Sequence, residues 1–155
     1  MNIFLNKKIL IYGLGKSGLF TFKFLKNKND IFVYDDYKIK IKKPFTQKNF
    51  VNYKEILRSK FDLIIISPGI DINKCKLSKF LKKNHSKIYS DLDVFYSFFK
   101  NDCITITGTN GKSTTCKLMY EVLSDQKFDV KLVGNIGNPI LSVKNVKKKN
   151  YFCYR

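Results

Sequence analysis

The chain has 155 residues, 44% of them hydrophobic and 15% aromatic, which is enough apolar material for a packed core and excludes a fully disordered protein. No apolar run approaches the roughly 18 residues that a membrane-spanning helix needs, and the first residues lack the cleavage site of a secretory signal. The four cysteines are widely spaced and form no C-x-x-C pair, so neither a disulfide framework nor a zinc site is expected. We therefore expect a cytoplasmic protein with no membrane partner.

The net charge is strongly positive, because 30 lysines and arginines face 12 acidic residues and give +18. Such a charge is typical of proteins that bind nucleic acid or an anionic membrane. Only Arg58 and Arg155 are arginines, however, whereas readers of nucleic acid favour the bidentate fork of arginine. The chain is also rich in Asn, Ile, Phe and Tyr, which share AT-rich codons with lysine. We interpret the lysine excess as genome composition that gives a solvated surface, and expect no nucleic-acid partner.

Strand-like and helix-like segments alternate along the chain, which predicts parallel sheets with right-handed crossovers. The expected strands are residues 8–12, 31–35, 62–67, 87–89, 103–107 and 129–133, and the expected helices are residues 16–27, 53–59, 77–83, 91–99 and 113–124. The rhythm restarts between residues 90 and 100, so we expect two α/β units with ligands at the carboxyl ends of their strands. The second unit contains only two or three strands and predicts an incomplete sheet.

A glycine-rich loop follows the first expected strand. Residues 13–18 read Gly-Leu-Gly-Lys-Ser-Gly and match G-x-G-x-x-G at the start of a helix. The first glycine permits a sharp turn, the second lets the backbone approach a phosphate, and the third permits close packing of helix on strand. Asp35, at the end of the next strand, could bind a ribose hydroxyl. The residues alone therefore indicate a dinucleotide such as NAD, with a glycine turn that serves only packing as the alternative.

A second glycine loop has the placement of a phosphate loop, between an expected strand and an expected helix. The residues expected to bind ATP are Gly108, Thr109, Asn110, Gly111, Lys112, Ser113 and Thr114. Backbone N–H groups would hold the phosphates, Lys112 would act as the catalytic cation on the β and γ charges, and Ser113 would ligate Mg²⁺. The loop is shorter than the standard G-x-x-x-x-G-K-[ST], since Ile106 stands where its first glycine would be. A chance turn that carries a lysine is the alternative.

These motifs resemble those of the Mur ligases, the ADP-forming amide ligases of peptidoglycan precursor synthesis. The resemblance rests on Thr-Gly-Thr-Asn-Gly-Lys-Ser-Thr at 107–114, Gly-Leu-Gly-Lys-Ser-Gly at 13–18, Ser-Pro-Gly-Ile at 67–70 and Gly-Asn-Ile-Gly-Asn-Pro at 134–139. In this order they look like the members that add D-glutamate. The resemblance implies an α/β fold with an N-terminal Rossmann-like parallel sheet domain (residues 1–92), which binds the UDP substrate. The start of a P-loop Mur-ligase central ATP-binding domain, truncated, would follow (residues 93–155).

The resemblance also assigns the first glycine loop to UDP instead of NAD. The residues that it implies at UDP are Gly15, Lys16, Ser17, Asp35, Asp36, Ser67, Pro68, Gly69 and Asn135. Tyr37 departs from the family, which often has a basic residue there. The implied reaction uses ATP and Mg²⁺ to phosphorylate the terminal carboxylate of UDP-N-acetylmuramoyl-L-alanine, after which the amine of D-glutamate attacks the acyl phosphate. The family also implies a monomer.

The chain has about one third of the length that a three-domain ligase needs. We therefore expect it to be inactive by itself. Its last residues, Phe-Cys-Tyr-Arg, are what one inserted T would make of codons for Phe-Val-Ile-Glu, so we hypothesise a single-base frameshift. Two other readings stay open: a non-catalytic nucleotide- or NAD-binding Rossmann module, which would bind NADH at least as well as UDP, and a basic nucleic-acid-binding protein, whose affinity would fall steeply with salt.

Overall fold

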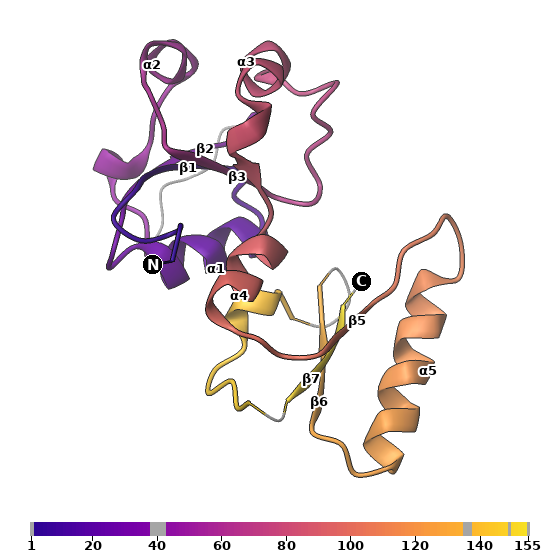
Figure 1. Ribbon diagram of the computed structural model, residues 1–155. Helices are drawn as coiled ribbons and strands as arrows, with labels where there is room; N and C mark the ends of the chain where they lie inside the picture. Colours follow the sequence, from indigo (N-terminus) through magenta and orange to yellow (C-terminus); the bar gives the residue numbers. More distant parts are fainter. Residues whose placement is uncertain (1, 38–42, 135–137, 149, 155) are drawn as a thin grey trace. The chain divides into compact units, whose positions relative to one another are not determined.

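The computed structural model describes residues 2–37, 43–134, 138–148 and 150–154. The chain forms two compact units, residues 1–94 and 95–155, each of which has its own parallel sheet (Figure 1). The assignment of residues 1–92 to the substrate and residues 93–155 to ATP stays a prediction. In the described part of the chain, no helix combines the length and the apolar character that crossing a membrane requires.

The first unit is built on a four-stranded parallel sheet in the order β2-β1-β3-β4. Its strands are β1 (Lys8–Tyr12), β2 (Asp30–Tyr34), β3 (Leu63–Ile66) and β4 (Ile88–Tyr89). The two central strands, β1 and β3, are apolar along almost their whole length because helices cover both faces of the sheet. Their register pairs Ile9 with Leu63 and Tyr12 with Ile66, so both strands end at the same edge.

Helices lie on both faces of this sheet (Figure 1). They are α1 (Lys16–Leu25) on one face and α2 (Tyr53–Arg58) and α3 (Ser78–Lys83) on the other. Short 3-10 turns are η1 (Gln47–Asn49) and η2 (His85–Lys87), and α4 (Asp91–Phe98) begins in the first unit and ends in the second. A reciprocal cap starts α2, since Asn52 accepts from the Glu55 N–H at 3.0 Å and Glu55 accepts from the Asn52 N–H at 2.7 Å. The core beneath α2 and α3 includes Leu10, Ile64 and Leu81.

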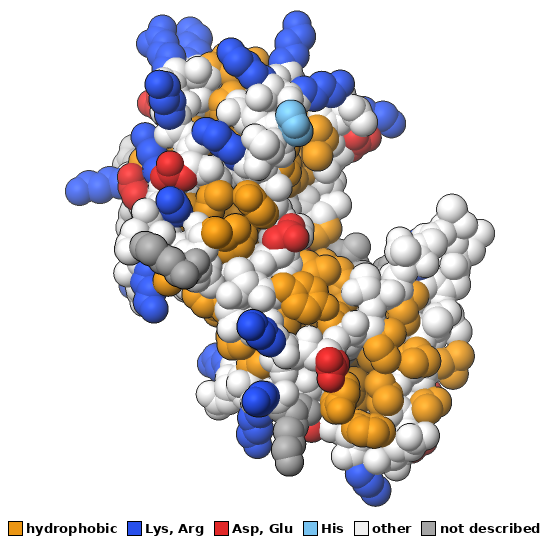
Figure 2. All heavy atoms as spheres, viewed as in Figure 1, with side chains coloured by type: hydrophobic (Ala, Val, Ile, Leu, Met, Phe, Trp, Pro, Cys, Tyr) orange, Lys and Arg blue, Asp and Glu red, His pale blue; other side chains and the backbone are white. Residues whose placement is uncertain are grey.

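Lysine side chains populate the outer surface of the first unit (Figure 2). On α2 and α3 the exposed basic residues are Lys54, Arg58, Lys79, Lys82 and Lys83. They stand opposite the buried Ile56 and Leu81, so both short helices are amphipathic. This arrangement is the solvated basic surface that the composition suggests.

The second unit has a three-stranded parallel sheet in the order β5-β7-β6. Its elements are β5 (Cys103–Thr105), α5 (Lys112–Asp125), β6 (Val130–Val133), η3 (Ile140–Ser142) and β7 (Tyr151–Tyr154). One face packs against α5 through a core of Cys116, Val130 and Cys153. The last strand in the sequence, β7, is thus the middle strand of the sheet, where it pairs Cys153 with Ile104 and Leu132.

Asn101 fastens the segment before β7 to the segment before β5. Its side chain is 8% exposed, and its Nδ2 donates to the carbonyl oxygens of Lys147 at 2.8 Å and Asn150 at 2.9 Å. Asn150 in turn accepts from the Lys147 N–H at 2.7 Å. These bonds close a turn whose end leads directly into the middle strand.

We expect Asn101→Ala to lower the free energy of unfolding by about 1–3 kcal/mol, because it removes the bond to the Lys147 carbonyl and leaves the buried Asn150 carbonyl without its side-chain donor. Urea denaturation followed by circular dichroism measures the loss. Gln126→Ala is the matched control, since Gln126 is exposed just beyond α5 and its substitution should change stability by less than about 0.5 kcal/mol. Equal stability of the two variants would show that the Asn101 bonds do not hold the turn.

Candidate functional site

The first glycine loop forms a tight turn at the carboxyl end of β1. Gly13 has φ +93°, a conformation that glycine adopts without strain, and its carbonyl accepts from the Ser67 hydroxyl at 2.8 Å. A Cβ added to Gly18 would overlap the carbonyl oxygen of Gly13, so α1 begins in direct contact with the turn. At Gly15 a Cβ would meet nothing within 4 Å. The turn is therefore closed by packing at its two ends and open to an approaching group in its middle.

The remaining residues expected at this loop lie around it. Lys16 is exposed and Ser17 half-buried in the first turn of α1, where the backbone N–H groups have no partner within the helix. Ser67 lies against the turn, and Pro68 and Gly69 follow it on the exposed segment after β3. An anion held at Gly15 would thus meet the positive end of the helix dipole.

Asp35 holds the glycine turn in place. Its Oδ2 accepts from the Leu14 N–H at 2.7 Å, and its Oδ1 accepts from the Tyr37 N–H at 3.0 Å. Each carboxylate oxygen keeps a lone pair for a further donor, so the expected contact with a nucleoside stays a prediction. The motif did not predict this orienting role, which depends on the order of the strands that bring Asp35 beside Leu14.

Asp36 and Lys76 tie together the loops that follow β2 and β3. The Lys76 Nζ donates to the Asp36 carbonyl at 2.7 Å, and the Lys76 N–H donates to the Asp36 Oδ2 at 3.2 Å. A cavity of about 210 Å³ lies between these loops, with Asp35, Asp36 and Gly69 in its lining. The structure thus brings three of the expected UDP residues to one cavity. Lys76 gave no signal in the sequence, because it is one of many lysines in a lysine-rich stretch.

The second glycine loop lies between the carboxyl end of β5 and the start of α5. Gly108 has φ +142° and Gly111 has φ +74°, and Gly111 caps the helix. The Lys112 Nζ donates to the carbonyl oxygens of Thr109, at 2.9 Å, and Gly108. Ser113 and Thr114 belong to the first turn of α5, and Asn110 is exposed in the loop.

This loop fits a nucleotide phosphate. Gly108 and Gly111 turn the backbone tightly with positive φ angles. The N–H groups at the start of the 14-residue α5 and the Lys112 ammonium, which folds over the loop, place positive charge beside this turn. Asn135, the remaining expected site residue, lies outside the described residues. Within the described part of the chain, no group of three or more His, Cys, Asp or Glu side chains could hold a metal ion.

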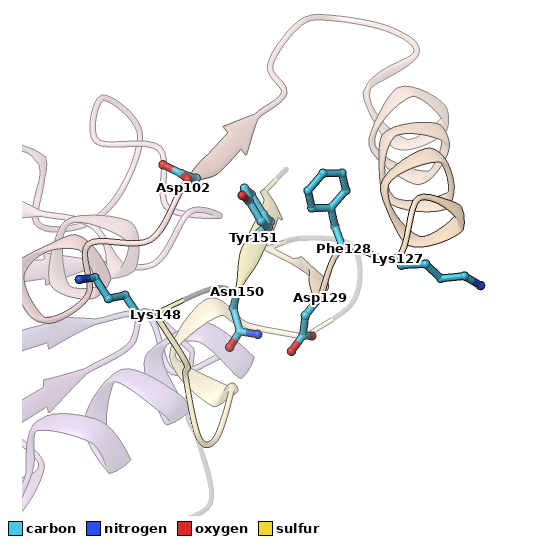
Figure 3. Close-up of a pocket in the computed structure, with 7 residues that line it drawn as sticks. All are labelled: Asp102, Lys127, Phe128, Asp129, Lys148, Asn150 and Tyr151. Carbon is cyan, nitrogen blue, oxygen red and sulfur yellow. The ribbon is translucent and has the colours of Figure 1, made fainter.

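A different cavity, of about 680 Å³, opens at the amino ends of the second sheet (Figure 3). Phe128 and Tyr151 form its aromatic wall, with ring centroids 5.2 Å apart in an edge-to-face arrangement. Asp129 also lines it and accepts from the Lys131 Nζ at 2.6 Å, which holds the pKa of that carboxyl below its usual value. None of the residues expected at either glycine loop lines this cavity, and it lies at the opposite end of the strands from the loop at 108–114.

Two domain models match the chain at the two glycine loops. The first, Mur ligase MurD-like, N-terminal domain, matches residues 7–88, and the second, Mur ligase middle domain, matches residues 106–152. The chain belongs to the Mur ligase family. The resemblance inferred from four short motifs is thereby confirmed, as is the α/β fold class with two parallel sheets.

Individual Mur ligases are similar over nearly the whole chain. UDP-N-acetylmuramoylalanine–D-glutamate ligase of Rickettsia bellii is 34% identical over 95% of this chain and 33% of its own length. The corresponding ligase of Rickettsia prowazekii is 38% identical over 93% of this chain and 33% of its own. A solved pseudomurein peptide ligase type C from Methanothermus fervidus is 24% identical, with a TM-score of 0.48, over 96% of this chain and 33% of its own. The chain spans about one third of the length of the curated relatives that it matches.

Proposed function

We propose that the chain carries the UDP-substrate unit and the ATP loop of a ligase that joins D-glutamate to UDP-N-acetylmuramoyl-L-alanine in peptidoglycan precursor synthesis. The observation that supports this function is the presence of two phosphate-type loops, each at the carboxyl edge of its own parallel sheet, in the chain order of the two matched Mur ligase domains. The two Rickettsia relatives carry this activity in their names. The products would be the amide, ADP and phosphate.

In the first unit, the open backbone at Gly15 and the first turn of α1, with Lys16 and Ser17, would bind the diphosphate. The cavity between the loops after β2 and β3 would take the nucleoside, with Asp35 and Asp36 on one side and Gly69 on the other. Ser67 and Pro68 would hold the segment that closes the turn.

In the second unit, the backbone of residues 108–114 would hold the phosphates of ATP, and Lys112 would offset the charge on the transferred group. The Ser113 hydroxyl would hold Mg²⁺, which would supply charge neutralisation. The protein would thus contribute mainly position and charge, which phosphoryl transfer to a carboxylate requires. Asn135 would complete the site between nucleotide and substrate.

Isothermal titration calorimetry of the full chain tests this proposal. We expect UDP to bind more tightly than NADH, and MgATP to bind independently of UDP. NADH affinity equal to or greater than UDP affinity would overturn the proposal in favour of a non-catalytic NAD-binding module. Binding of duplex DNA that rivals UDP and weakens steeply with salt would favour a nucleic-acid protein.

Substitution of Lys76 tests the wall of the nucleoside cavity. Lys76→Met removes the Nζ bond to the Asp36 carbonyl, so we expect the Kd of UDP to rise about two- to tenfold, the cost of one hydrogen bond. Lys79→Met is the matched control, since Lys79 is an exposed lysine on α3 and is not among the residues that line the cavity. Calorimetric titration with UDP measures both. Equal Kd values for the two variants would show that the bond between Lys76 and the Asp36 carbonyl does not shape the UDP site.

The expectation that this length of chain makes no product stays a prediction. An assay of ADP release with UDP-N-acetylmuramoyl-L-alanine, D-glutamate and MgATP checks it. We expect no ADP above the rate without enzyme, because the chain spans about one third of the relatives that perform the reaction. ADP release that depends on D-glutamate would contradict it.

A further inference from the structure

Unpartnered polar groups gather beneath the cavity between the loops after β2 and β3. Tyr12, the last residue of β1, is completely buried, and its hydroxyl has no hydrogen-bond partner among the described residues. Burial, followed by the neighbouring Asp36 carboxylate and Cys75 thiol, raises the pKa of Tyr12. The Oδ1 of Asp36 is likewise buried without a partner in the described chain. The Tyr12 hydroxyl thus lies beside Asp36 and Cys75, two residues that line the cavity, and Asp36 keeps one buried oxygen for a further donor.

Cys75 lies in the wall of this cavity. A single turn after β3 places it there, since the Cys75 N–H donates to the Asp71 carbonyl at 3.0 Å and its Sγ lies 3.7 Å from the Ile72 carbonyl. The thiol is half-buried and shares the cavity with Asp36 and Gly69. The Sγ makes one weak bond, at 3.7 Å, and Cys75 lies between the core around Tyr12 and the cavity that a nucleoside would occupy.

The other cysteines have different surroundings. Cys116 and Cys153 are completely buried in the core of the second unit. Cys103 is half-buried in β5, also in the second unit, and lines none of the described cavities. The chain thus contains one thiol at the candidate nucleoside cavity, one thiol of similar exposure elsewhere, and two that reagents reach only after the core opens.

We infer that Cys75 is a modification site for soft electrophiles, and that a uridine nucleotide and an adduct on Cys75 exclude each other from the cavity. The inference rests on the proposed function for its ligand. With a maleimide, the thiolate adds to the carbon–carbon double bond: an S–C bond forms, the π bond breaks, and the neighbouring carbon takes a proton from water. No oxidant or reductant takes part. The adduct is of nucleobase size and would fill a cavity of about 210 Å³.

Alkylation of the full chain with N-ethylmaleimide, with each cysteine quantified by peptide mass spectrometry, tests the inference. We expect Cys75 to react at least about tenfold faster than Cys116 and Cys153, which need a local opening of the core. UDP at about ten times its calorimetric Kd should slow the reaction at Cys75 about tenfold and leave Cys103 unchanged. Prior alkylation should abolish the heat of UDP binding.

Two variants separate Cys75 from the other thiols. In Cys75→Ser, the Kd of UDP should be the same before and after treatment with maleimide. In Cys103→Ser, treatment should still abolish UDP binding. Loss of UDP binding after treatment of Cys75→Ser would overturn the inference, because another thiol would then be responsible.

The calorimetric titration also separates this inference from the proposed function. If UDP binds but does not shield Cys75, the inference is wrong and the proposed function stands. If UDP produces no heat with untreated protein, the proposed function fails, and mutual exclusion fails with it. If UDP binds and Cys75 resists alkylation as strongly as Cys153, the thiol does not face the cavity and the inference is wrong.

Discussion

Alanine at position 18 is expected to lower the free energy of unfolding of the first unit by about 3 kcal/mol, the upper end for an overpacked site. The added Cβ would overlap the carbonyl oxygen of Gly13 and would lie 3.2 Å from the Ser67 Oγ. The first of these is backbone and cannot rotate away, so either the turn or the start of α1 must move. Urea denaturation followed by far-ultraviolet circular dichroism measures the change.

Gly69→Ala is the matched control for this loss. A Cβ on Gly69 would meet nothing within 4 Å, and the residue is not among the glycines with positive φ. Its substitution should therefore change stability by less than about 0.5 kcal/mol. If Gly18→Ala proves as stable as Gly69→Ala, then α1 does not begin in contact with the turn.

Gly15→Ala separates packing from ligand approach within the same motif. Position 15 has open space for a Cβ, so the variant should lose less stability than Gly18→Ala. Under the proposed function, the new methyl group occupies space that the diphosphate needs, and the Kd of UDP should rise. A stable Gly15→Ala variant with unchanged UDP affinity would place the diphosphate elsewhere.

The strands of the first unit could be predicted from the sequence because their signal is local. The apolar runs of β1 and β3 are continuous, and both strands begin and end within one residue of expectation. The middle strand of the second unit, β7, shows the opposite case. Its run of Tyr151–Tyr154 follows a lysine-rich turn, and the pairing with β5 and β6 that places it depends on residues distant in the sequence.

In the candidate site, too, the local features could be predicted from the sequence and the contacts between distant segments could not. Both glycine loops could be located from their own residues, because a turn with positive φ at the mouth of a helix needs glycine at fixed spacing. The hydrogen bonds that join one loop to another could not be predicted from the sequence. Lys76 reaches Asp36 only because β3 lies next to β1, and the Tyr12 hydroxyl lies under the cavity because β1 ends beside β2. Such contacts follow from strand order, which no single segment encodes.

Replacing Lys112 with methionine is expected to weaken MgATP binding at least about tenfold, the cost of losing one charge-assisted contact in the phosphate loop. The Lys112 Nζ contacts only the carbonyl oxygens of Gly108 and Thr109 among the described residues, both within the loop itself. The variant should therefore keep its helix and its UDP affinity, which depends on the first unit. Calorimetric titrations with MgATP and with UDP measure the two effects separately.

The main competitor to this interpretation is non-specific attraction, because a chain of net charge +18 draws any polyanion. Lys117→Met removes the same charge from the exposed surface of α5, and therefore lowers the net charge equally. If the charge alone binds MgATP, the two variants will weaken binding by the same small factor, and added salt will abolish it. If the loop binds MgATP, only Lys112→Met will weaken binding strongly, since only its ammonium is held against the turn where the phosphates would lie.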